Sequence, residues 1–125
     1  MPKPSRIEPV HIRAADWLRA QDPPRGAQEG FHFGTQCVVI RYSTDMVGEG
    51  PRLHVHPYDE IFHVLEGRAE FTVGERRFEA GPGDLVIGPA NVPHAYVNLG
   101  PGRLDSVDFH LSDRWIQYDL PRQSS

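Results

Sequence analysis

Three histidines and one glutamate are the residues of this chain whose types and spacing best suit chemistry. His54, His56 and Glu60 lie close together in the sequence, and His94 follows a turn rich in glycine and proline. Imidazole nitrogens and a carboxylate oxygen suit a divalent transition metal such as iron, manganese, zinc, nickel or copper. Three or four protein ligands on such an ion leave room for water or substrate, which distinguishes a catalytic site from a closed structural one.

β-Strands are the elements that must position these side chains. Because side chains alternate along a strand, His54 and His56 point to the same side and can bind one ion together. Glu60 follows a turn that contains Pro57, so alternation alone cannot place it, and it must return on the next strand. His94 must come from a strand far away in the sequence.

The four candidate ligands belong to two longer spaced motifs. The first motif comprises Gly48, His54, His56, Glu60 and Gly67, and the second comprises Gly83, Pro89, Asn91, His94 and Asn98. Both resemble the two motifs of the cupin superfamily, and the short distance between them resembles the small single-domain bacterial cupins. The second motif departs from the family at Asn91, where glycine is usual. Asparagine adopts positive φ more readily than most other residues, so we expect the turn to survive.

The resemblance implies an all-β fold, a double-stranded β-helix or jelly-roll barrel. It also implies that His54, His56, Glu60 and His94 hold a divalent metal inside the barrel. Small cupins form dimers by strand exchange or sheet packing, so a homodimer is expected. The apolar segments 37–40 and 31–33 are the candidate interface.

The local sequence agrees with many short strands. Apolar and β-branched runs are separated by glycine and proline every few residues, as in sandwiches and barrels. We expect a lead-in over residues 1–34 that packs on the barrel, the barrel over 35–111, and a C-terminal segment over 112–125. The lead-in is predicted to hold a short helix over 14–20 and an exposed loop over 21–30. The C-terminal segment is predicted to hold a short helix over 112–120, with Ser112 as its N-cap.

Four further residues are candidates for contact with a substrate. Arg52 shares the side of His54 and could bind a substrate carboxylate through two hydrogen bonds, although such an arginine is more often a surface residue. Phe62 shares the side of Glu60 and is either barrel packing or a pocket residue. Tyr96 shares the side of His94, and the sequence fits a pocket-lining residue and an ordinary core residue equally well. His110 is a candidate pocket residue or a partner of the metal ligands.

Composition restricts the partners and the location. The chain of 125 residues has a net charge of −4 with histidine neutral, and it has no basic run, so nucleic acid is not an expected partner. No apolar run approaches the ~20 residues of a membrane-spanning helix, so no membrane partner is expected. Cys37 is the only cysteine, which excludes an internal disulfide and favours a reducing compartment. We therefore expect a cytoplasmic protein.

Three kinds of function fit a metal cupin. The first is a small-molecule enzyme of dioxygenase, isomerase, decarboxylase or lyase type, in which the metal chelates an oxygenated or carboxylated substrate. The second is a module that binds or senses a small ligand without turnover. The third is a structural role in which the metal only stabilises the barrel. The resemblance favours the enzyme, and fold and ligands alone do not identify the substrate.

Overall fold

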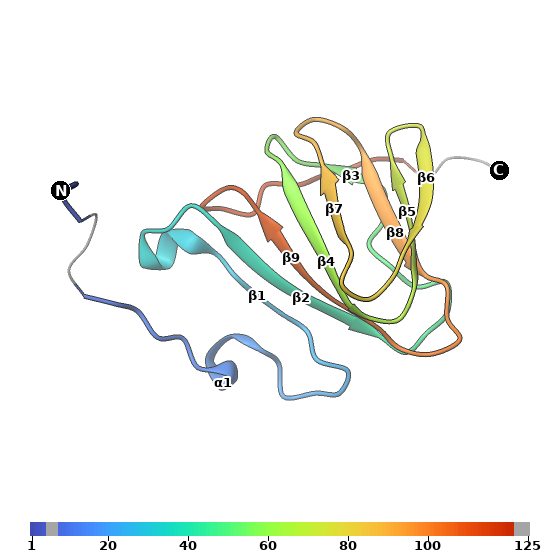
Figure 1. Ribbon diagram of the computed structural model, residues 1–125, viewed down its shortest axis with the longest axis horizontal. Helices are drawn as coiled ribbons and strands as arrows, with labels where there is room; N and C mark the ends of the chain where they lie inside the picture. Colours follow the sequence, from blue (N-terminus) through green and yellow to red (C-terminus); the bar gives the residue numbers. More distant parts are fainter. Residues whose placement is uncertain (5–7, 122–125) are drawn as a thin grey trace.

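The protein is built from two antiparallel five-stranded β-sheets, which the computed structural model describes for residues 1–4 and 8–121. The first sheet has the strand order β1 (Gly26–Gln28), β2 (Val38–Thr44), β9 (Leu104–His110), β4 (Glu60–Glu66) and β7 (Leu85–Gly88). The second has the order β10 (Tyr118–Asp119), β3 (His54–Val55), β8 (His94–Asn98), β5 (Ala69–Val73) and β6 (Arg76–Ala80). Figure 1 shows the two sheets, with β1 at the outer edge of the first. The expected all-β class is confirmed.

The core lies between the sheets because alternate residues of each strand face inward. Phe62 and Val64 of β4 are buried, and they belong to one apolar cluster with Phe71 of β5, Tyr96 of β8 and Leu104 of β9. Burying such a side chain stabilises the fold by about 1.5–3 kcal/mol. The cluster includes residues of both sheets, so it fixes how they face each other and where the adjoining polar residues lie.

Positive φ angles mark several turns, and one of these turns confirms an expectation from the sequence. Gly74 has positive φ in the tight hairpin that joins β5 to β6. Asn91 has a φ of 65°, so it adopts the left-handed conformation for which cupins usually have glycine. Gly67 shows why some turns require glycine, because it has a φ of 85° and a Cβ atom there would collide with the carbonyl of Arg103.

The lead-in differs from the sequence prediction in two places. The predicted helix over 14–20 is confined to α1 (Ala14–Trp17), because the next residue, Leu18, already forms a bridge with Gly26. The predicted exposed loop over 21–30 is wrong in part. Its second half forms β1, which completes the edge of the first sheet beside β2, and the short 3₁₀ helix η1 (Gly30–Phe33) follows.

The predicted C-terminal helix over residues 112–120 is wrong. The segment runs as bends and an extended stretch, and it ends in the two-residue strand β10, which pairs with β3. Its backbone is held by tertiary contacts instead of helical ones. The Ile116 carbonyl accepts a hydrogen bond from the His56 side chain, and the Ile116 backbone N–H donates to the Tyr58 hydroxyl. These contacts override the weak local helix propensity. The last four residues of the predicted C-terminal segment lie outside the described part of the chain.

Candidate metal centre

The four residues expected to bind a metal converge at one end of the space between the sheets. His54 and His94 lie directly opposite each other on β3 and β8, His56 follows β3, and Glu60 begins β4 in the other sheet. All four side chains are buried, with exposed fractions of 5% or less. One potential ligand atom from each lies within 4.8 Å of those of the other three. The buried cluster therefore has the composition and size of a divalent metal site.

Two of the histidines are oriented by hydrogen bonds from the ring nitrogen that faces away from the cluster. His54 Nδ1 contacts the carbonyl of Arg52, and His56 Nδ1 contacts the carbonyl of Ile116 at 2.6 Å. A carbonyl can only accept, so each Nδ1 carries the proton. The Nε2 lone pair of each ring is then free to bind a metal.

Several polar atoms at the centre of the cluster lack a hydrogen-bond partner. They are His56 Nε2, His94 Nε2 and Glu60 Oε1. Glu60 Oε1 lies 3.2 Å from His56 Nε2 and 3.0 Å from His94 Nε2, but neither contact has hydrogen-bond geometry. Buried polar atoms without partners cost about 1–3 kcal/mol each, so native proteins contain few of them. A cation bound between these atoms would satisfy all three, and the residues present therefore fit a metal.

The electrostatics of the site favour the forms that bind metal. Burial lowers the pKa of His54 to about 4, so this imidazole is neutral at pH 7. Burial alone would raise the pKa of Glu60, but its contacts with His110, His56 and His94 outweigh burial and hold the pKa below its usual range. At neutral pH the site thus presents a carboxylate and at least one neutral imidazole, as metal coordination requires.

His110 supports Glu60 rather than joining the four candidate ligands. The two residues are directly paired on β9 and β4, and His110 Nε2 lies 3.1 Å from Glu60 Oε2. His110 Nδ1 lies 2.7 Å from the Tyr58 hydroxyl. Burial lowers the pKa of His110, so the ring is neutral at pH 7. The neutral ring can donate a hydrogen bond from Nε2 to Glu60 and accept a hydrogen bond from the Tyr58 hydroxyl at Nδ1. These two contacts fix the orientation of the carboxylate.

Tyr58 is a site residue that the sequence did not reveal. Its ring stacks on His56 with the centroids 5.0 Å apart, and its hydroxyl also contacts the backbone of Ile116. Burial raises the pKa of Tyr58 to about 12, so the hydroxyl keeps its proton at neutral pH. Its position between His56 and Glu60 lies in a part of the motif that carries no fixed residue type, so no sequence signal distinguished it.

A cavity of about 240 Å³ lies beside the cluster. All four residues expected to contact a substrate line it, namely Arg52, Phe62, Tyr96 and His110. The cavity is also lined by residues that sequence reasoning missed, namely Ile40, Tyr42, Pro51, Asp108, Trp115, Gln117 and Asp119. His54 and Glu60 are in the same wall, so a small molecule in the cavity would lie against the candidate metal ligands.

Asp108 is a second buried carboxyl group in the wall of this cavity, beside Glu60. Its Oδ2 accepts a hydrogen bond of 2.7 Å from the Tyr96 hydroxyl, whereas its Oδ1 is buried and has no partner. Burial, followed by the negative charge of Glu60, raises the pKa of Asp108 well above its usual value. The sequence held one signal for Asp108, because it lies two residues before His110 and therefore shares its side of β9.

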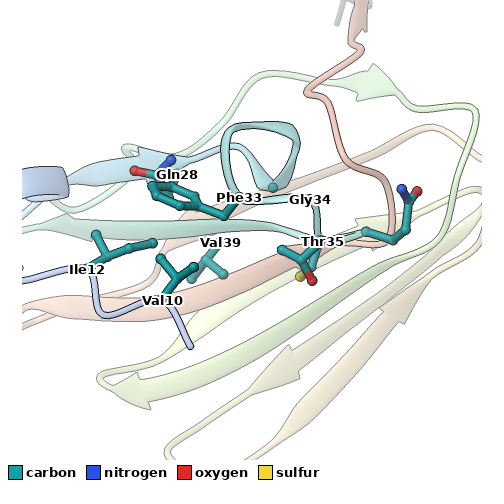
Figure 2. Close-up of a pocket in the computed structure, with 10 residues that line it drawn as sticks. Val10, Ile12, Gln28, Phe33, Gly34, Thr35 and Val39 are labelled. Atoms are coloured by element: carbon teal, nitrogen blue, oxygen red, sulfur yellow. The ribbon is translucent and has the colours of Figure 1, made fainter. Parts of the chain in front are cut away.

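A second and larger hollow lies away from the histidine cluster, on the outer side of β1 and β2. It has a volume of about 610 Å³, and Figure 2 shows Val10, Ile12, Phe33 and Val39 among the residues around it. Cys37 also lines it, and burial raises the pKa of that thiol. The lining has no histidine, acidic or basic side chain, so the hollow offers little chemistry of its own.

The fold and the buried cluster together define a class of protein, a two-sheet β protein with a candidate divalent metal site between the sheets. The sequence model of the family described as the Cupin domain matches residues 41–109, which include all four clustered residues. The chain belongs to the cupin family.

Curated relatives match the chain over part of its length. An uncharacterized protein of Methanocaldococcus jannaschii is 38% identical over 55 residues, which cover 43% of this chain and 44% of the relative. A dimethylsulfoniopropionate lyase of Ruegeria pomeroyi is 46% identical over 43 residues, covering 34% of this chain and 21% of the lyase. An acireductone dioxygenase of Rhodopseudomonas palustris is 38% identical over 64 residues, covering 48% and 38%. The chain therefore spans less than half the length of these relatives.

Solved structures share the fold at low sequence identity. A protein of Klebsiella pneumoniae with a double-stranded β-helix domain superposes with a TM-score of 0.71 at 20% identity, covering 92% of this chain and 100% of the other. An oxalate decarboxylase of Bacillus subtilis with Mn(II) centres gives a TM-score of 0.70 at 20% identity, covering 91% of this chain and 30% of the other. These likenesses establish the fold alone. In the described part of the chain, none of the helices is long and apolar enough to span a membrane.

Proposed function

We propose that this cupin binds a divalent transition metal through His54, His56, Glu60 and His94 and acts as a small-molecule enzyme. The observation that carries the proposal is the set of unpartnered buried atoms of His56, Glu60 and His94 beside a cavity of about 240 Å³. When bound, such a metal would act as a Lewis acid on a chelating oxygenated or carboxylated substrate. Iron, manganese, zinc, nickel and copper all suit these ligands.

The protein's own residues would orient and enclose that substrate. Arg52 lies at the exposed rim of the cavity, and its guanidinium forms no hydrogen bond or ion pair with the residues described here. It is therefore free to bind an anionic group of an incoming molecule. Phe62 and Tyr96 provide buried walls, and His110 holds Glu60 in place. The small volume of the cavity and the burial of its wall residues would exclude bulk water from the reacting groups.

The reaction belongs to the dioxygenase, isomerase, decarboxylase or lyase types. The names of the partial relatives, a lyase and a dioxygenase, support this range without choosing within it. The alternative is a cupin that binds or senses a small ligand without turnover. The two are separated by assaying the loaded protein, because only an enzyme forms product from a ligand that binds saturably.

Elemental analysis of purified wild-type protein and His56→Ala by plasma mass spectrometry tests the metal site. We expect close to one metal ion per wild-type chain and a large loss in the variant. His63→Ala is the matched control, because His63 lies on β4 with its side chain on the other face from Glu60. No metal in wild type after reconstitution with each of the five metals would refute the site.

The identified metal then selects the assays, with dioxygen consumption for iron or copper and decarboxylation, isomerisation or elimination panels for the others. Glu60→Ala should abolish turnover while leaving the thermal unfolding transition cooperative. Unchanged turnover in that variant would contradict an enzymatic role for the site.

A homodimer is the second part of the proposal. The segments proposed as its interface from the sequence, 31–33 and 37–40, lie beside the outer hollow of Figure 2, where Phe33, Cys37 and Val39 form part of the lining. Light scattering after gel filtration should give twice the chain mass of 14.1 kDa. A Val39→Glu variant should shift the mass towards one chain, and a monomeric wild type would contradict the proposal.

A further inference from the structure

Asp108 has one carboxylate oxygen satisfied and one left over. It is 3% exposed, its Oδ2 is held by the Tyr96 hydroxyl, and its Oδ1 has no hydrogen-bond partner. Tyr96 is itself 2% exposed, and its hydroxyl also contacts Ser106 Oγ at 3.2 Å, so the pair is fixed in position. A buried polar atom without a partner is energetically costly. This cost indicates that a bound molecule supplies the missing hydrogen-bond partner.

Asp108 is one of the residues in the wall of the cavity that adjoins the metal cluster. Asp108, His54 and Glu60 all line that cavity. Along β9, Asp108 lies one inward position before His110, which contacts Glu60. A molecule whose one end reached the metal would therefore have its other end near Asp108. The volume of about 240 Å³ is below the range of drug-sized ligand sites, so that molecule must be small.

We propose that Asp108 is a specificity-determining residue that hydrogen-bonds a hydroxyl group of the ligand, at the end away from the metal. The inference rests on the proposed function, since it assumes that the ligand's other end chelates the metal. A hydroxyl both donates and accepts, so it satisfies Oδ1 whether or not Asp108 is ionised. A carboxylate at this position has no proton to donate, so it would not satisfy Oδ1 of an ionised Asp108. The ligand class is therefore a small molecule with an oxygen chelating group at one end and a hydroxyl at the other.

A matched series of hydroxamates tests this assignment, because hydroxamates chelate a metal through two oxygens and leave the tail variable. Acetohydroxamate has a methyl tail, glycolohydroxamate a hydroxymethyl tail, and glycine hydroxamate an aminomethyl tail. Each would be titrated calorimetrically into the metal-loaded wild type and into Asp108→Ala, with metal content measured on the same samples. A hydrogen bond to a buried carboxyl corresponds to about a ten- to hundredfold preference for the hydroxymethyl over the methyl tail in wild type.

In Asp108→Ala we expect that preference to fall to within about threefold, with the metal content and the affinity for acetohydroxamate maintained. Glu75→Gln is the control, because Glu75 is an exposed carboxylate in the turn between β5 and β6 and does not line the cavity, and it should retain the preference. Tyr96→Phe should reduce the preference without abolishing it, since Asp108 loses its fixed partner.

Four outcomes would overturn the inference, and they are distinguishable. Equal binding of the methyl and hydroxymethyl tails by loaded wild type would show that the site does not recognise a hydroxyl group. Tightest binding of the aminomethyl tail would show that it recognises an amine instead. A preference that persists in Asp108→Ala would show that Asp108 is not the residue that recognises the hydroxyl group. Absence of metal from the wild type would instead refute the proposed function, and the inference with it.

Discussion

Glu60 is the residue on which the contacts of the metal centre converge. One carboxylate oxygen faces His56 and His94, and the other contacts His110 Nε2 at 3.1 Å. Oxygen Oε1 is thus available to a metal, while Oε2 serves to orient the group. Residues that orient a metal ligand act on affinity without changing the number of ions bound.

His110→Ala tests the orienting role. Removing the imidazole leaves Glu60 Oε2 without its buried donor, so we expect metal affinity to fall by about ten- to hundredfold while the binding stoichiometry stays the same. Competition with a chromophoric chelator measures this affinity. Loss of all metal would indicate that His110 is itself a metal ligand. A metal affinity equal to that of the His63→Ala control would show that His110 does not orient Glu60.

Gly88→Ala tests how closely the site is packed. A Cβ atom at Gly88 would lie 3.2 Å from both His94 Nδ1 and Phe62 Cε2, so the His94 ring would have to shift by a few tenths of an ångström. Metal affinity is expected to fall by about tenfold or less, because metal sites tolerate only small displacements. Gly81→Ala is the control, since a Cβ there meets nothing within 4 Å. Equal affinities for the two variants would show that the neighbours of Gly88 yield freely.

The four clustered residues could be predicted from the sequence because they occur in two spaced motifs, and each motif limits both residue type and distance. Tyr58 and Asp108 could not be predicted in this way. Tyr58 acts through contacts with His110 and Ile116, which are more than 50 residues away. Asp108 matters because one of its oxygens lacks a partner, and that depends on how β9 packs against the facing sheet.

At the scale of elements, the C-terminal segment from residue 112 contacts the side chains that surround the metal centre. The Ile116 carbonyl accepts from His56 Nδ1, the Trp115 ring lies 5.4 Å from the His110 ring, and Gln117 lines the cavity. A helix over residues 112–120 was the wrong prediction because local propensity is weak beside such contacts. The strand β1 was missed for a related reason, since a three-residue strand is defined by its pairing with β2 rather than by its own sequence.

Shortening the chain tests this coupling. A protein ending at Ser112 lacks Ile116, so His56 loses the carbonyl that accepts from its Nδ1 and Tyr58 loses the N–H that donates to its hydroxyl. Metal affinity should fall by about ten- to hundredfold, as for the loss of other groups that orient ligands. The matched control ends at Pro121 and retains β10. Circular dichroism should show two folded β proteins that differ only by the two-residue strand β10. Equal metal affinities would mean that the segment does not orient His56.

For the whole molecule, stability depends on contacts between strands that are distant in sequence. Asp105 of β9 accepts two hydrogen bonds from Arg41 of β2, at 2.7 and 2.6 Å, and one from Ser43 Oγ. The regular spacing of turns was enough to predict many short strands and an all-β fold. It could not specify that β2 pairs with β9, because that pairing depends on packing of the complete chain, and here the family resemblance supplied the architecture.

Acid should weaken this connection between β2 and β9. Burial would raise the pKa of Asp105, but hydrogen bonds from Arg41 and Ser43 outweigh burial and lower it. The pair therefore stabilises the protein fully above the unfolded pKa of about 3.9, and this stability is lost as pH falls through the lower folded pKa. Asp105→Asn should lower the free energy of unfolding at pH 7 by about 1–3 kcal/mol. Urea titrations from pH 7 to pH 2 should then show a smaller acid loss in the variant, and an identical acid loss would exclude Asp105 as a source.

A bound metal would connect the two sheets, because Glu60 belongs to the first sheet and His54 and His94 belong to the second. An ion that binds only the folded chain at a hundred times its Kd stabilises that chain by about 2.7 kcal/mol. Removing the metal with a chelator should therefore lower the melting temperature of wild type by several degrees, and adding it back should restore the loss. In Glu60→Gln the neutral amide binds metal weakly, so chelator and metal should have little effect. The comparison measures the site through the stability of the whole fold, and an equal shift in both proteins would place the metal elsewhere.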